Sequence, residues 1–316
     1  MLEVKDLAVA FGSIAPLSGV TFSLAKGETL GIVGESGSGK SLTAMSIMGL
    51  LPMSDGRVTS GSIVFDGQEL TTLNESDYCK LRGGRIGLIT QNPMTSLDPL
   101  KKIGTQVDAV AILHLGMAKK KARANTVDIL HTLRIPEPAL ICERYPHQMS
   151  GGMKQRIVIA MALAADPDLL IADEPTTALD VTVQAQIIRL LDDLVKQRGL
   201  ALLLITHDMS VVAQTCDRVV VMYAGRAIEQ GPVLDIFDNP QHPYTQALVG
   251  CIPRDLKDGE KLTSIPGTVP TVLNYPEGCK FHPRCTRAQN ICTTVQPELD
   301  RNGDSAVACH FAGASI

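Results

Sequence analysis

Residues 34–41 read GESGSGKS, with glycines, a lysine and a hydroxyl side chain at the spacing of a phosphate-binding loop. Glycine lets the backbone wrap closely around phosphate oxygens, and the start of a helix favours negative charge. Lys40 can reach the β- and γ-phosphates of a nucleotide, and the Ser41 hydroxyl can bind Mg²⁺. An apolar run at 30–33 and a helical pattern after the loop supply the flanks that the motif needs. The residues expected to contact the nucleotide are Gly34, Glu35, Ser36, Gly37, Ser38, Gly39, Lys40, Ser41 and Leu42.

A pair of carboxylates, Asp173 and Glu174, follows a second apolar run at 169–172. Ligands gather at the carboxyl ends of strands in open α/β sheets, so both side chains are expected near the nucleotide. Asp173 is suited to hold Mg²⁺ directly or through water. Glu174 is suited to polarise a water in line with the γ-phosphate. The alternative is that the two carboxylates are ordinary surface charges, but their position directly after a buried apolar run argues against it.

A further helix start with anion-binding character lies at 148–156, QMSGGMKQR. Ser150, Gly151 and Gly152 would point backbone N–H groups at a negative ligand. A plain serine–glycine helix cap explains these residues equally well. They can serve the same nucleotide as the first loop only if folding or association brings both to one point.

Half of the eight cysteines lie near the end of the sequence, with the spacing C-x5-C-x6-C-x16-C. Structural zinc sites usually contain C-x2–4-C pairs, which are missing here, and ferredoxin patterns differ as well. The spacing therefore predicts a four-thiolate site that suits zinc or an iron–sulfur cluster about equally. Its ligands would be Cys279, Cys285, Cys292 and Cys309.

The elements that must position these residues change in character along the chain. Residues 1–90 alternate strands with turns, about 95–165 are mostly helical, and 166–230 return to parallel strands and helices. Residues 257–316 are rich in proline, glycine and polar side chains, so they cannot form a stable hydrophobic core without a cross-link or a bound metal. No internal repeat is visible, which predicts one nucleotide-binding unit per chain.

Composition excludes several classes of protein. The 316 residues carry a net charge of −4, 3% aromatic residues and no tryptophan, which is unlike a nucleic-acid binder. The first residues include the acidic Glu3 and Asp6 and lack the long apolar core of a signal peptide. The longest uncharged apolar run, 157–165, is too short to span a bilayer. We expect a chain on the cytosolic side that does not itself cross a membrane, where clustered cysteines favour metal or redox chemistry.

Taken together, the motifs resemble the ATP-binding-cassette (ABC) family over roughly residues 1–250. The sequence MSGGM resembles the family's signature motif, with methionines in place of the commoner leucine and glutamine. The resemblance implies a P-loop α/β core with an antiparallel β subdomain and a helical subdomain at about 95–165. It also implies two cassettes joined head to tail, so that the signature residues contact the partner's ATP. These residues are Ser150, Gly151, Gly152 and Met153.

Other positions take family roles through the same resemblance. Gln91 in LITQNP matches the Q-loop, which binds Mg²⁺ and couples to the transmembrane partner, and Asp180 matches the D-loop. Phe11 in LAVAFG matches the aromatic residue that stacks on adenine. His207 in LLLITHD matches the switch histidine that contacts the γ-phosphate, and Glu174 matches the general base. ATP and Mg²⁺ are the implied cofactors.

The sequences HPYTQAL, IPGTVP and GCKFHPRC resemble the C-terminal extension of dipeptide and oligopeptide importer ATPases, which implies a boundary near residue 250 and an extension at 251–316. Relatives of that kind carry a [4Fe–4S] cluster on four matching cysteines, with zinc as the alternative here. We expect loss of Cys285 to loosen this segment while residues 34–41 still bind ATP.

The resemblance implies a peripheral subunit on the cytoplasmic side of the bacterial inner membrane. Its partners would be a second ATPase, two transmembrane permeases and an extracytoplasmic binding protein, with no nucleic acid. The sequence does not name the cargo, so importers of glutathione, opines, nickel chelates or antimicrobial peptides are alternatives. A non-transport ABC ATPase and a redox or iron–sulfur-assembly protein are more distant ones.

Overall fold

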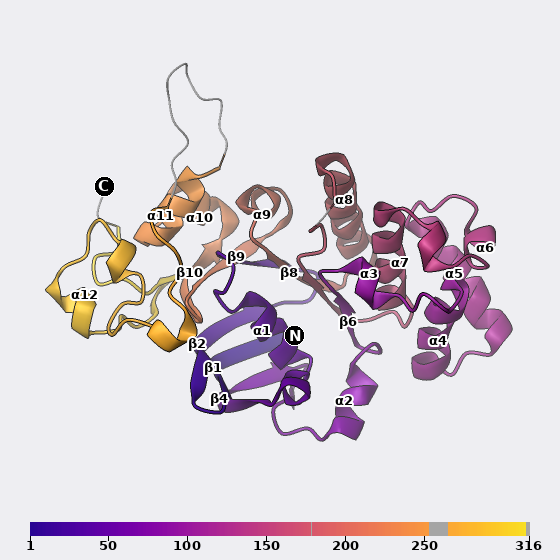
Figure 1. The fold of residues 1–316 in the computed structure, drawn as a ribbon, viewed down its shortest axis with the longest axis horizontal. Coiled ribbons are helices and arrows are strands. Elements are labelled where there is room, and N and C mark those ends of the chain that lie inside the picture. Colours follow the sequence, from indigo (N-terminus) through magenta and orange to yellow (C-terminus); the bar gives the residue numbers. More distant parts are fainter. Residues whose placement is uncertain (178, 253–264, 314–316) are drawn as a thin grey trace, which may run out of the picture. The chain divides into compact units, whose positions relative to one another are not determined.

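A computed structural model describes residues 1–177, 179–252 and 265–313 (Figure 1). The chain divides into two compact units. The first unit contains Met1–Ala25, Thr29–Thr72 and the described residues of Ile205–Ile316, and the second contains Lys26–Glu28 and Leu73–Leu204.

The first unit contains an antiparallel sheet with the strand order β2-β1-β4-β5. Leu2 at the start of β1 lies opposite Leu24 on one side and Phe65 on the other. Side chains at the start of β1 alternate between buried and exposed, as expected for strands with one face on a core. The strands are β1 (Leu2–Phe11), β2 (Ile14–Leu24), β4 (Gly56–Phe65) and β5 (Gln68–Glu69).

A second group of strands in this unit has the order β11-β12-β10-β9-β3. Strand β3 is buried along its whole length and runs parallel to β9, while the pairs β9–β10, β10–β12 and β11–β12 are antiparallel. The C-terminal segment, residues 265–313, contributes two of these strands, and β12 pairs Ala306 and Val307 with β10. The strands are β3 (Thr29–Val33), β9 (Arg218–Tyr223), β10 (Arg226–Pro232), β11 (Asp300–Asn302) and β12 (Ser305–Val307).

The C-terminal segment packs onto the core of the first unit, which sequence reasoning did not foresee. Tyr223, Tyr244 and Phe281 are buried together, with ring centroids 4.7 Å apart for the two tyrosines and 5.3 Å apart for Tyr244 and Phe281. The helices of the first unit are α1 (Lys40–Ile47), η1 (Leu51–Ser54), α9 (Met209–Thr215), α10 (Val233–Asp238), α11 (Pro243–Gly250), η3 (Val272–Asn274), η4 (His282–Arg284) and α12 (Asn290–Thr294).

The second unit contains strands in the order β8-β7-β6, and β6 runs parallel to β7 with Ile86 opposite Leu169. Its strands are β6 (Ile86–Ile89), β7 (Leu169–Asp173) and β8 (Ala201–Thr206), of which the last two residues belong to the first unit. Its helices are α2 (Glu75–Leu81), α3 (Pro93–Ser96), α4 (Ile103–Leu115), α5 (Lys119–Thr132), α6 (Pro138–Ile141), η2 (Pro146–Gln148), α7 (Gly151–Leu163) and α8 (Val181–Arg198).

A buried polar contact ties two of these helices together. Asp108 of α4 accepts hydrogen bonds from Arg123 Nε at 2.9 Å and from the Thr126 hydroxyl at 2.6 Å, both on α5. A buried carboxylate is tolerated when it is paired and hydrogen-bonded, as here. Among the described residues, no helix combines the length and the apolar character that crossing a membrane requires.

Candidate functional site

The predicted phosphate loop joins β3 to α1 in the first unit. Gly34, Gly37 and Gly39 all have positive φ angles, which glycine adopts without strain. A Cβ atom at Gly34 would lie 2.2 Å from the carbonyl oxygen of Met222, so no larger residue fits there. Helix α1 starts after Gly39 without a side-chain cap, and the N-terminal end of a helix favours an anion.

Lys40 lies at the loop itself. Lys40 is 5% exposed, and its Nζ donates to the carbonyl oxygens of Gly34 at 2.8 Å and of Glu35 at 3.1 Å. The ammonium group is therefore held against the loop backbone and does not extend into solvent. Ser41, the predicted Mg²⁺ ligand, is exposed in the first turn of α1.

In the second unit, the structure brings together two predicted residues that are 83 positions apart. Gln91 Nε2 donates to Glu174 Oε2 at 2.9 Å, and the Thr177 hydroxyl donates to the same oxygen at 2.8 Å. Glu174 follows β7 with φ at +45°, a conformation that costs a non-glycine residue on the order of 1–3 kcal/mol. This carboxylate is thus held in one orientation by its backbone and by two donors.

The predicted signature residues open α7 in the same unit. Ser150 caps this helix by accepting the backbone N–H of Met153 at 3.3 Å. Ser150 and Gly151 are exposed, and a Cβ atom at Gly152 would lie 2.8 Å from Val183 Cγ1 of α8. Asp180, the predicted D-loop residue, caps α8 by accepting the Val183 N–H at 2.9 Å. The starts of α7 and α8 therefore pack on each other, and Ser150 does serve as a helix cap.

The predicted nucleotide residues are divided between the two units. Phe11, the phosphate loop with Leu42, and His207 belong to the first unit. Phe11 packs on Gly56, where an added Cβ atom would lie 2.7 Å from its ring. His207 is exposed and precedes α9, which is capped by the neighbouring Asp208. The second unit contains Gln91, Ser150, Gly151, Gly152, Met153, Asp173, Glu174 and Asp180.

Sequence reasoning missed two residues, one in α11 and one in the C-terminal segment, that contact the phosphate loop. Arg284 forms an ion pair with Glu35 at 2.8 Å, and the Tyr244 hydroxyl accepts the backbone N–H of Glu35 at 2.9 Å. Neither residue carries a local signal of this role, because the partners are more than 200 positions apart in the sequence.

The four C-terminal cysteines line one small cavity in the first unit, with a volume of about 20 Å³. That is room for about one water molecule. Burial, with smaller contributions from the neighbouring thiols, raises the pKa of the Cys279 thiol to about 11. Within the described residues, no three or more Cys, His, Asp or Glu side chains are arranged to hold a metal ion. The structure thus shows the thiols converging, but it gives no support to the predicted iron–sulfur or zinc ligation itself. The cavity-lining cysteines are Cys279, Cys285, Cys292 and Cys309.

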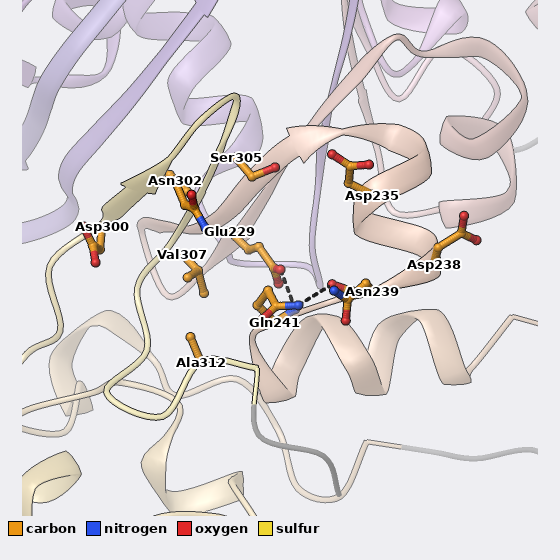
Figure 2. A pocket seen from close by; sticks show the side chains of 11 residues that line it. Glu229, Asp235, Asp238, Asn239, Gln241, Asp300, Asn302, Ser305, Val307 and Ala312 are labelled. Carbon is orange, nitrogen blue, oxygen red and sulfur yellow. Dashed lines mark hydrogen bonds between the residues drawn. The ribbon is translucent and has the colours of Figure 1, made fainter.

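A larger polar pocket of about 620 Å³ lies beside β10 (Figure 2). Glu229 is buried in its wall and accepts the backbone N–H groups of Gln241 at 2.6 Å and of His242 at 3.0 Å. Burial raises the pKa of this carboxyl group, while the hydrogen bonds lower it by less. Sequence reasoning did not find this pocket. Its lining residues are Glu229, Asp235, Asp238, Asn239, Gln241, Asp300, Asn302, Ser305, Ala306, Val307 and Ala312.

Comparison with known proteins gives two family matches along the chain. Residues 17–177 match the family described as ABC transporter, and residues 228–292 match the oligopeptide/dipeptide transporter, C-terminal region. Among solved structures, a dimeric post-hydrolysis state of the ATP-binding cassette MJ0796, bound to ADP and phosphate, is 28% identical with a TM-score of 0.66. It is aligned over 74% of this chain and 99% of that one, which confirms the predicted cassette fold.

Curated relatives are similar along nearly their whole length. The oligopeptide transport ATP-binding protein AppD of Bacillus subtilis is 49% identical over 95% of this chain and 92% of its own. The oligopeptide transport ATP-binding protein OppD of Escherichia coli is 49% identical, over 94% and 89%. The dipeptide transport ATP-binding protein DppD of Escherichia coli is 45% identical, over 98% and 96%. The chain therefore belongs to the ATP-binding proteins of the ABC transporter family, in the group that carries the oligopeptide/dipeptide transporter C-terminal region.

Proposed function

We propose that this chain hydrolyses ATP to energise the import of dipeptides or oligopeptides through an ABC transporter. The observation that carries this proposal is the pair of family matches on one chain, together with relatives that bear the names of peptide transport ATP-binding proteins. The phosphate loop, with its buried Lys40, supports the ATP-binding half of the proposal.

The chemistry begins with the bound triphosphate. Lys40 and the N–H groups at the start of α1 would bind the β- and γ-phosphate oxygens, and the ring of Phe11 would stack on adenine. Ser41, Gln91 and Asp173 would hold Mg²⁺, which neutralises charge on the phosphates when bound. Their hydroxyl, amide and carboxylate oxygens are the ligands that Mg²⁺ prefers.

Glu174 is the proposed general base. Its carboxylate, oriented by Gln91 and Thr177, would take a proton from the water that attacks the γ-phosphorus. The bond between that phosphorus and the bridging oxygen then breaks, and ADP leaves with the bridging oxygen. His207 would contact the departing γ-phosphate.

The signature residues are proposed to act on the ATP of a second cassette. Ser150 and Gly151 are exposed at the start of α7, where backbone N–H groups favour an anion. Asp180, at the neighbouring start of α8, would belong to the same interface. The cassette MJ0796, whose structure is described as dimeric, supports this arrangement. The signature set is Ser150, Gly151, Gly152 and Met153.

The remaining partners follow from the proposed transporter. Two permeases would cross the membrane, an extracytoplasmic protein would deliver the peptide, and this chain would lie peripherally on the cytoplasmic side of the inner membrane. Met94 and Leu100, which are 62% and 86% exposed shortly after Gln91, are apolar side chains suited to contact a permease.

We also retain the proposed division into an ATP-binding domain at 1–250, with a helical subdomain at about 95–165, and an extension at 251–316. Helices α4, α5, α6 and α7 fall in that subdomain and support it. Residues 253–264 and 314–316 of the extension lie outside the described residues.

The four thiols are proposed to hold a [4Fe–4S] cluster. Four cysteines from separate parts of the extension line one cavity, and this donor set is the one that such clusters use. Zinc, which also binds four thiolates, is the alternative.

Metal analysis of anaerobically purified protein tests the cluster. We expect about four irons with matching sulfide per chain. Cys285→Ser should lose them, whereas the exposed Cys79→Ser should not. Zinc without iron would favour the alternative, and iron that is unchanged in Cys285→Ser would contradict the site.

The transport function is tested in the assembled transporter. With the permeases and the binding protein in vesicles, ATP hydrolysis should rise when peptide is supplied, and labelled peptide should accumulate inside. Glutathione, a nickel chelate and an opine serve as competing cargoes. Stimulation by one of these and not by any peptide would reassign the cargo, and activity without permeases that ignores every cargo would defeat the importer assignment.

A further inference from the structure

The C-terminal segment contacts the phosphate loop through a two-point ion pair. Arg284 Nη1 donates to Glu35 Oε2 at 2.8 Å, and Nη2 donates to Oε1 at 3.1 Å. The Arg284 side chain is 6% exposed and that of Glu35 is 30% exposed. Paired hydrogen bonds between a guanidinium and a carboxylate fix direction as well as distance. Arg284 therefore holds the Glu35 side chain in one place.

The guanidinium group is itself held rigidly. Its Nε donates to the carbonyl oxygen of Pro266 at 2.8 Å, and its central carbon lies 5.7 Å from the Tyr223 ring and 5.9 Å from the Phe281 ring. The planar arginine head stacks on aromatic rings in a way that lysine does not reproduce. The ion pair thus rests on the aromatic cluster of the first unit.

Glu35 joins this support to Lys40, the proposed phosphate-binding lysine. Its side chain contacts Arg284, its backbone N–H donates to the Tyr244 hydroxyl, and its carbonyl oxygen accepts from Lys40 Nζ. Three different groups on one loop residue therefore connect the C-terminal segment, α11 and the ammonium group that meets the phosphates.

The charge of Glu35 makes this contact matter for binding. A carboxylate within a loop that receives a triphosphate repels the ligand, and the repulsion is strong where burial lowers the dielectric constant. The guanidinium of Arg284 compensates for this charge on the side of the protein. Without it, the loop would present an uncompensated negative charge to ATP, and the Glu35 side chain would lose the contact that fixes its position.

We propose that Arg284 is a positioning residue for the nucleotide, acting through Glu35 to keep the phosphate loop in the conformation that binds ATP. The C-terminal segment then contributes to nucleotide binding by supporting the phosphate loop. Arg284 directly precedes Cys285, and Phe281, on which its guanidinium lies, lines the cysteine cavity. The proposal does not depend on which metal, if any, the thiols hold.

The test is the ATP dependence of hydrolysis by the assembled transporter carrying Arg284→Gln. We expect KM for ATP to rise about tenfold, since hydrogen bonds to charged groups contribute more than neutral ones, while kcat at saturating ATP stays within about twofold. Arg284→Lys keeps the charge but loses the two parallel hydrogen bonds of the guanidinium, so the KM of this variant for ATP should rise by about threefold. The matched control is Arg301→Gln, an exposed arginine of β11 in the same segment, and it should leave KM unchanged.

A double-mutant cycle shows whether Arg284 acts through Glu35. In a Glu35→Gln background, Arg284→Gln should change KM by no more than about twofold, because the interaction is already gone. The proposal is overturned if KM is unchanged in Arg284→Gln, if Arg301→Gln raises it equally, or if the two effects multiply independently. Should Arg284→Gln fail to fold, the Arg284→Lys variant in both backgrounds decides in the same way.

Discussion

The phosphate loop and the signature loop are both glycine-rich starts of helices, but they are supported very differently. The phosphate loop has a buried lysine on its own carbonyl groups, a tyrosine hydroxyl on its backbone and an arginine on its side chain. The signature loop has its serine cap at 3.3 Å and packs on α8, and its first residues are exposed. The phosphate loop is supported by residues from distant parts of this chain, whereas the first residues of the signature loop are exposed. This difference is what the proposed sharing of a nucleotide between two cassettes would require.

The largest effect is expected at the proposed base, Glu174. Glu174→Gln keeps the hydrogen-bonding shape but cannot accept a proton, so turnover should fall by about 10²–10⁴-fold. ATP affinity should change little, because the phosphate loop is unaltered. Single-turnover hydrolysis and equilibrium ATP binding measure the two quantities, and turnover like that of the unmodified protein would contradict the assigned role.

Lys40→Ala tests whether the phosphate loop of this chain binds ATP without help from the signature loop. The ammonium group is a buried charged donor, so its loss should weaken ATP binding by the purified full chain by about 100-fold. Titration with a fluorescent ATP analogue measures this. Ser150→Ala, tested in parallel, should leave that affinity unchanged. Equal losses in both variants would mean that the two loops do not have different roles.

Ser150→Asn separates the capping role of Ser150 from its proposed contact with the partner's ATP. Asparagine is as good a helix cap as serine, so the stability of α7 should be kept. Its larger side chain should obstruct the phosphate, and turnover of the assembled transporter should fall by about tenfold. Thermal unfolding and hydrolysis are measured on the same preparation. Normal turnover with normal stability would leave Ser150 as a cap alone.

The smallest effect concerns the acid sensitivity of the support behind the phosphate loop. His242 is fully buried and accepts the Tyr244 N–H at Nδ1, and burial lowers its pKa to about 3. In the unfolded chain its pKa is about 6.5, so the unfolded state binds the proton first as pH falls. The contribution of His242 to the free energy of unfolding should therefore be fully present above pH 6.5 and should be lost as the pH falls from 6.5 to about 3.

His242→Asn checks this, because its side-chain oxygen can accept the same N–H without titrating. Between pH 7 and pH 4.5 the unmodified chain should lose about 2 kcal/mol more than the variant in urea unfolding. Parallel pH profiles for the two proteins would show that His242 does not titrate on unfolding.

Much of the site could be read from the sequence because its signals are local. The phosphate loop, its strand and its helix lie within about 20 residues, and the caps at Ser150 and Asp180 follow from short-range preferences. The pairing of Gln91 with Glu174 agrees with their assignment to one site, although that assignment came from family resemblance.

Long-range contacts could not be read in this way. Nothing near Arg284 indicates that it pairs with a residue 249 positions earlier, and β12 is too short for its pairing with β10 to show as periodicity. The expectation that Cys285→Ser spares ATP binding treated the extension as separate from the phosphate loop. The contact at Glu35 now predicts weakened, though not abolished, ATP binding in that variant.

The addition of β12 to β10 has a practical consequence for dissecting the cysteine-rich segment. Truncation before residue 305 would strip Glu229 and Gln230 of their ladder partners and leave a freshly exposed sheet margin, which invites aggregation. A shortened protein would then precipitate for reasons unrelated to thiols or nucleotide. Point substitutions are the sound way to learn what those thiols contribute.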